Sequence, residues 1–108
     1  MNNFERFGGK DEIWIGLAKV QQHDNNGVLG DVNQAYTNIV AYANNRSKFR
    51  SRVKQALSEL NLQLLRLENA ELLKDRLLRY TLDDDLKQVV KNVEGTGLTG
   101  FSTFHAFD

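Results

Sequence analysis

Length, composition and charge already limit what this chain can be. It has 108 residues with 14 basic and 14 acidic side chains, so its formal net charge is zero when both histidines are neutral. This length fits one domain of ordinary size, and zero net charge argues against a protein that is strongly basic or acidic as a whole. The lack of cysteine excludes a disulfide framework, a thiolate zinc site, an iron–sulfur cluster and a cysteine nucleophile.

No secretory signal or membrane span is recognisable, because no apolar stretch of the sequence reaches the required length. We therefore expect a cytoplasmic protein that does not insert into a membrane.

Helix-breaking residues are confined to the flanks of the chain. There is no proline, and all eight glycines lie outside residues 31–94. An uninterrupted stretch of this length favours helices joined by short polar turns. The sequence thus predicts an all-α fold: a single helical domain over residues 1–108, with a bundle of four to five helices around one long helix at about 47–68.

Residues 11–20 fit two patterns. With Asp11 as the cap, the apolar residues that follow form one face of a helix, although Gly16 weakens it. The same residues alternate as in a short strand near 12–20 that would turn at Asn25-Asn26-Gly27. We favour the helix because no convincing partner strand follows.

The next segment predicts a second helix. Asp31 is a suitable cap, and the apolar residues that follow share one stripe at a spacing of 3.6 residues. These residues are Val32, Ala35, Tyr36, Ile39, Val40 and Ala43. Asn44 and Asn45 are expected to end this helix.

The long helix is predicted from Ser47 to about Glu68, with a length of about 33 Å at 1.5 Å per residue. Its core-facing stripe consists of Phe49, Val53, Ala56, Leu57, Leu60, Leu64 and Leu67. Leu62 and Leu65 fall outside this stripe if the helix is regular, so they need a second partner.

Two interpretations account for the leucines beyond Glu68. The helix breaks near Asn69 and restarts as an antiparallel neighbour that extends to Tyr80, or it continues and buries a second stripe in an oligomer. The residues of this oligomer seam are Leu62, Leu65, Leu72 and Leu73. On this basis we expect a homo-oligomer, with a dimer favoured.

The last helix is predicted over Thr81–Glu94. Thr81 and Asp84 have the spacing of a capping box, acidic residues at 83–85 suit a helix N-terminus, and Gly95 follows the end. The three aspartates diverge on a helix, so we interpret them as capping residues and not as metal ligands.

The C-terminal segment carries Phe101, Phe104 and Phe107 at a spacing of three. We expect segments 1–10 and 95–108, both of which contain glycine and phenylalanine, to pack on the bundle and complete its core. The alternative is that the three rings form a docking tail for another protein.

The glycines at 95, 97 and 100 match a dinucleotide-binding motif, but no strand precedes them and the chain ends shortly after, so a turn is the better interpretation.

A basic cluster marks the start of the long helix: Arg46, Lys48, Arg50, Arg52 and Lys54. No acidic residue lies between Val32 and Ser58. Three interpretations stay open: a solvated face, a surface for an acidic protein partner such as another copy that presents residues 68–85, or a phosphate-binding surface for nucleic acid.

No catalytic machinery is recognisable. His23 and His105 are the only imidazoles, and neither is spaced to act with a nucleophile or to build a metal site. We predict a protein without cofactor or metal that is not an enzyme and acts by protein–protein interaction, as an adaptor, an inhibitor or an assembly or chaperone-like subunit that self-associates. The alternative is a nucleic-acid-associated regulator that uses the basic cluster.

Overall fold

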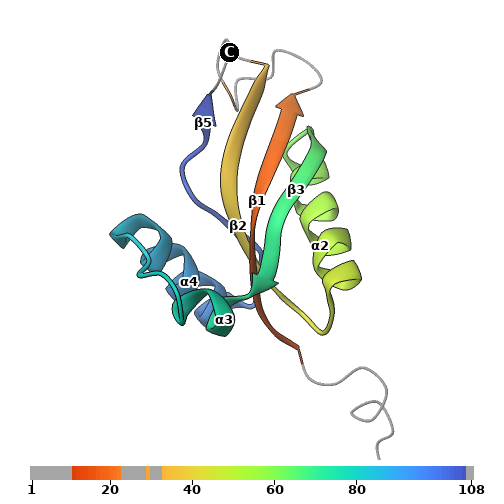
Figure 1. Cartoon of the computed structure of the whole chain (residues 1–108). Helices are drawn as coiled ribbons and strands as arrows, with labels where there is room; N and C mark the ends of the chain where they lie inside the picture. Colours follow the sequence, from red (N-terminus) through yellow and green to blue (C-terminus); the bar gives the residue numbers. More distant parts are fainter. Residues whose placement is uncertain (1–10, 23–28, 30–32, 107–108) are drawn as a thin grey trace, which may run out of the picture.

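An antiparallel β-sheet forms the centre of the protein (Figure 1). The computed structural model describes residues 11–22, 29 and 33–106. The elements found there are β1 (Glu12–Gln22), β2 (Gln34–Ala43), α2 (Arg46–Glu59), β3 (Leu62–Leu72), α3 (Leu73–Leu77), α4 (Asp84–Thr96), β4 (Gly100–Phe101) and β5 (His105–Ala106). The sheet order is β3-β1-β2-β4, and β5 also pairs with β2. The all-α helical bundle predicted from the sequence is therefore wrong.

β1 and β2 form a long antiparallel pair where two helices were expected. The register runs without interruption from Glu12 opposite Ala43 to Gln21 opposite Gln34. Both segments carry apolar residues on both faces, such as Ala18 and Ile15 in β1, and Ile39 and Val40 in β2. Such a segment satisfies a helical period and a strand period equally well. The partner strand that the sequence did not reveal is the segment interpreted as the second helix. Asp31, its expected cap, and the turn Asn25-Asn26-Gly27 lie outside the described residues.

The long helix is shorter than predicted. α2 begins after Asn45, whose side-chain oxygen accepts a hydrogen bond from the backbone N–H of Lys48 at 2.8 Å. It ends at Glu59, and Asn61 follows with a positive φ of 58°. Asparagine tolerates this left-handed conformation, which turns the chain back onto the sheet. Residues 62–68, predicted to continue the helix, belong to β3.

β3 pairs with β1 and contains two irregularities. The register shifts between Lys19 and Val20 and again between Ile15 and Leu17 of β1. The second shift coincides with Asn69, which has a φ of 55°. Asn69 therefore marks a β-bulge and not a helix break. Both interpretations are wrong for residues 62–72, and only the short α3 that follows is helical.

The last helix is confirmed with changed ends. The side chain of Asp83, and not that of Thr81, accepts the capping hydrogen bond, from Leu86 N–H at 2.8 Å. The helix passes Gly95 and ends at Gly97, whose φ of 75° gives a left-handed C-terminal cap.

Helices cover the sheet on both faces, and each face has its own core (Figure 1). The α2-side core joins the buried stripe of α2 to the side chains of β1 and β2 on the same face; its members are Ala18, Val20, Ala35, Ile39, Ala41, Ala43, Phe49, Val53, Leu57 and Leu62. The α4-side core joins the opposite face to α3 and α4 through Ile15, Val40, Leu73, Leu86, Val89 and Val93. The core-facing stripe is confirmed for Phe49, Val53 and Leu57.

The C-terminal segment returns along β2. Phe101 pairs with Ile39, and Ser102 Oγ accepts a hydrogen bond from Asn38 N–H at 3.0 Å. The buried Thr37 hydroxyl donates to the carbonyl oxygen of Ser102 at 2.9 Å. These polar groups are satisfied inside the protein, so residues 100–102 are fixed on the sheet, and residues 105 and 106 pair with β2 further along.

Candidate protein-interaction surface

Large apolar side chains are exposed where α3 joins α4. Leu77 is 50% exposed, Leu78 84% and Tyr80 61%. Three such residues within four positions cost hydrophobic free energy that burial would recover. We call them the α3–α4 surface.

Leu77 and Tyr80 of this surface also line a hollow of about 470 Å³. Leu73, Leu82 and Val90 contribute to its wall and also belong to, or pack on, the α4-side core. Lys87, Lys91 and Glu94 of α4 contribute charged groups to the lining. A hollow with this lining is suited to an apolar side chain whose neighbours are polar.

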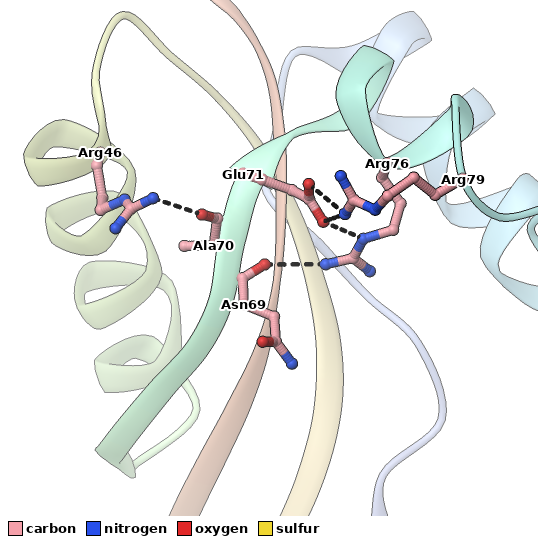
Figure 2. A network of polar contacts seen from close by, with 6 residues as sticks. All are labelled: Arg46, Asn69, Ala70, Glu71, Arg76 and Arg79. Atoms are coloured by element: carbon pink, nitrogen blue, oxygen red, sulfur yellow. Dashed lines mark hydrogen bonds and ion pairs between the residues drawn. The ribbon is translucent and has the colours of Figure 1, made fainter.

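The position of α3 depends on a polar cluster on its inner side (Figure 2). Arg79 Nη2 donates to both carboxylate oxygens of Glu71, at 2.6 and 2.7 Å, and Arg76 Nε donates to the same carboxylate. Arg76 Nη2 also donates to the carbonyl oxygen of Asn69 at 2.9 Å. The side chains of Arg76 and Arg79 point toward β3. The two leucines between them in the sequence, Leu77 and Leu78, are therefore exposed to solvent.

The electrostatics of this cluster are consistent with its geometry. Hydrogen bonds from Arg79 and Arg76 hold the pKa of Glu71 below its ordinary value, and the bond to Glu71 raises the pKa of Arg79. A second hollow, of about 640 Å³, is lined in part by these arginines. Both guanidinium groups already bind Glu71, so the role that these contacts support for the two arginines is to hold α3 against β3.

The basic cluster of α2 is exposed along its whole length. Arg52 lies 3.6 Å from Asp11, and Arg46 Nη2 donates to the carbonyl oxygen of Ala70 at 3.1 Å (Figure 2). Asn45, the helix cap, is uncharged, and the first turn of α2 holds no acidic residue. The structure thus gathers all five cations on one helix, as the sequence indicated.

The predicted oligomer seam is not a continuous surface. Leu62 is 2% exposed in the α2-side core, and Leu73 is 8% exposed in the α4-side core. Leu65 and Leu72 are half-buried in β3. The seam was predicted from the positions of the four leucines around a continuous helix. Three of them lie in β3, where side chains alternate between the two faces, so the prediction of a seam loses its basis.

The predicted docking tail is only partly described. Phe101 and Phe104 stack with ring centroids 6.0 Å apart and pack against the α2-side core, while Phe107 and segment 1–10 lie outside the described residues. This placement favours the core interpretation for the first two rings.

The acidic and histidine residues do not converge. Within the described residues, no group of three histidine, cysteine or acidic side chains is placed to hold a metal ion. Asp83 caps α4, and Asp85 accepts a hydrogen bond from Thr103 N–H at 3.2 Å. His105 is exposed in β5, and His23 lies outside the described residues.

The sequence reasoning missed the α3–α4 surface. Leu77, Leu78 and Tyr80 precede a recognisable helix start, and residues 77–80 carry three large apolar side chains with a single charge among them. Three large apolar residues directly before a helix cap indicate an exposed apolar surface. The predicted helical spacing instead placed them on the buried face of an expected helix.

Comparison with protein-family models, with curated proteins and with solved structures gives no match to this chain. In the part of the chain that the structure describes, none of the helices combines the length and the apolar character that a membrane crossing requires.

Proposed function

We propose that this protein is a non-catalytic interaction domain that binds another protein through the α3–α4 surface. The observation that carries the proposal is the exposure of Leu77, Leu78 and Tyr80 beside a hollow of about 470 Å³. Contiguous exposed apolar residues around a concavity are typical of interaction sites. Adaptor, inhibitor and assembly subunit are all roles compatible with such a surface.

The lining of the hollow indicates the chemistry of the partner. An apolar side chain would fill the space next to Leu73, Leu82 and Val90. Acidic residues beside that anchor would complement Lys87 and Lys91. We therefore propose a partner that presents an apolar anchor with adjacent acidic residues.

The test compares two exposed leucine sites in quantitative affinity purification from the native source. Leu77→Ser/Leu78→Ser changes the α3–α4 surface, whereas Leu98→Ser changes a leucine that is 69% exposed beyond the end of α4. We expect the first variant to lose the captured partner and the control to retain it, with unchanged thermal unfolding in both. Retention of the same partner by Leu77→Ser/Leu78→Ser would contradict the proposal.

The same variants examine self-association. Light scattering of the wild type at high concentration reports its oligomeric state. If a dimer forms and Leu77→Ser/Leu78→Ser dissociates it, the partner is a second copy. A dimer that is insensitive to this variant would place self-association at another surface.

A second candidate function is nucleic-acid binding by α2. It is supported by five exposed cations on one helix that has no acidic residue before Glu59. Phosphate contacts would give an affinity for DNA or RNA that falls steeply with salt and is lost in Arg50→Glu/Arg52→Glu. An unchanged fluorescence anisotropy at low salt would reject this candidate.

A further inference from the structure

β3 has one edge without a pairing partner among the described residues. It stands at the end of the sheet order, beside β1, and spans 11 residues, whereas β4 and β5 at the opposite side have 2 residues each. An edge strand presents backbone N–H and C=O groups that pair readily with an added strand.

One end of this edge is already protected. Arg46 donates to the carbonyl oxygen of Ala70 and Arg76 to that of Asn69 (Figure 2), and the bulge at Asn69 distorts the strand there. Bulges and capped carbonyl groups disfavour pairing. The part of the edge that is left for an added strand is therefore residues 62–68, where Leu64 and Leu67 are half-buried under α2. The other register shift of β3 falls at Leu65 within this part, so an added strand has to follow one bulge there.

The flank of α2 beside this edge is basic. The hydrogen bond from Arg46 to Ala70 places that flank over β3, and Arg50 and Lys54 follow Arg46 at intervals of four residues on the same side. The row is about 12 Å long, which matches about four residues of a strand. Within the described residues, neither Arg50 nor Lys54 has an acidic side chain within ion-pair distance.

We propose that residues 62–68 of β3 accept an extended acidic segment of a partner protein as an additional strand of the sheet. Main-chain hydrogen bonds to the free edge supply affinity, and acidic side chains next to Arg50 and Lys54 supply specificity. This site is separate from the α3–α4 surface and adds a second partner segment to the proposed function.

A second copy of the chain is the poorer occupant of this edge. Pairing of β3 with the β3 of another copy would bring two rows of Arg46, Arg50 and Lys54 together. Like charges in such proximity oppose association. An acidic strand has no such cost.

The probe is a fluorescent peptide of alternating glutamate and valine with the length of β3. We expect saturable binding by anisotropy at millimolar peptide or below. Arg50→Glu/Lys54→Glu is expected to weaken binding about tenfold, because two attractions become repulsions. The control Lys48→Glu/Arg52→Glu makes the same charge change away from the β3 edge and is expected to weaken binding about twofold or less, since salt screens distant charges.

Strand pairing is tested by a peptide of equal charge with proline in place of its two central valines. Proline lacks the N–H that a strand needs, so we expect about tenfold weaker binding. Hydrogen exchange should show new protection at backbone amides within residues 62–68. Leu77→Ser/Leu78→Ser should leave peptide binding unchanged, which separates this proposal from the α3–α4 surface.

Several outcomes would overturn the proposal. They are no binding at millimolar peptide, equal binding of the proline peptide, protection confined to α2, and equal weakening by the two charge variants. Tighter binding of single-stranded DNA of equal charge, with the same dependence on Arg50 and Lys54, would assign the basic row to nucleic acid instead.

Discussion

The two faces of the sheet are covered to different degrees. On the α2 side, Phe49, Val53 and Leu57 have no exposed surface, and the ring of Phe49 stacks on Trp14 at a centroid distance of 6.0 Å. On the α4 side, Val93 is 1% exposed, but the other buried helix residues, Leu73, Leu86 and Val89, keep 7–8% exposure. The α3–α4 surface on this side is exposed to solvent. One face holds the fold together, and the other leaves apolar area available to a partner.

Packing geometry explains the difference. α2 is a single helix of 14 residues, and it approaches β1 closely because Gly16 has no side chain. A Cβ at position 16 would lie 3.0 Å from Leu67 Cδ1 and 3.2 Å from Phe49 Cε2. The other face is covered by a helix of 5 residues and a separate helix of 13, and side chains of both helices line the hollow of about 470 Å³.

The largest expected effect is on the α2 side. Phe49→Ala removes a fully buried ring and leaves a cavity, so we expect the free energy of unfolding to fall by about 3–5 kcal/mol in urea titrations. Val89→Ala is the counterpart on α4, and its smaller side chain predicts a loss of roughly 2 kcal/mol. Equal losses would remove the contrast between the two faces.

Gly100 tests how tightly the C-terminal segment packs on α4. A Cβ there would lie 2.8 Å from Val89 Cγ1 and 2.9 Å from Val93 Cγ2, so Gly100→Ala should destabilise the protein by about 1–3 kcal/mol. Gly95→Ala is the control, because no atom lies within 4 Å of its Cβ position in α4. It should stabilise by about 0.5–1 kcal/mol through helix propensity. A stable Gly100→Ala protein would show that this contact relaxes easily.

Glu71 links β3 to α3, and its effect depends on pH. Its pKa is lowered in the folded protein, mainly by hydrogen bonds from Arg79 and Arg76. Its stabilising contribution is therefore fully present above the ordinary value of 4.5 and is lost as the pH falls through the lower folded pKa. Glu71→Gln should be less stable at neutral pH and should lose less stability on acidification. Thermal unfolding from pH 7 to pH 3 measures both; parallel curves for variant and wild type would show that Glu71 does not contribute.

The smallest effect on stability is expected at the α3–α4 surface. Leu78→Ser changes a side chain that is 84% exposed, so the free energy of unfolding should stay within about 0.5 kcal/mol of the wild type. The variant should still weaken partner binding. A marked loss of stability would mean that Leu78 packs in the fold and is not available to a partner.

Local signals in the sequence predicted two parts of the protein correctly. The apolar stripe of Phe49, Val53 and Leu57 identified the buried face of α2, and the aspartates at 83–85 identified the start of α4. Both depend on contacts within a few residues, namely helical spacing and a capping side chain. The five cations on α2 were equally visible, because a helix places neighbouring residues on one element.

The strands could not be found in the same way. Residues 34–43 show helical spacing, yet they form β2 because β1 lies beside them and pairs with every position from 34 to 43. Leu62 and Leu73 seemed to need an oligomer because a straight helix cannot bury them, whereas a strand with two bulges and a new helix buries each in a different core. Strand pairing depends on residues far apart in the chain, which period alone does not reveal.

The sequence by itself determined where α2 begins, that a helix follows the aspartates at 83–85, which face of α2 is buried and where positive charge gathers. Tertiary structure decided that the remaining segments form a sheet, that β3 keeps a free edge beside Arg50 and Lys54, and that Leu77, Leu78 and Tyr80 stay exposed. The physical reason is the range of the interactions: helical hydrogen bonds and caps are local, whereas a strand and an exposed surface are defined by what packs beside them and what does not.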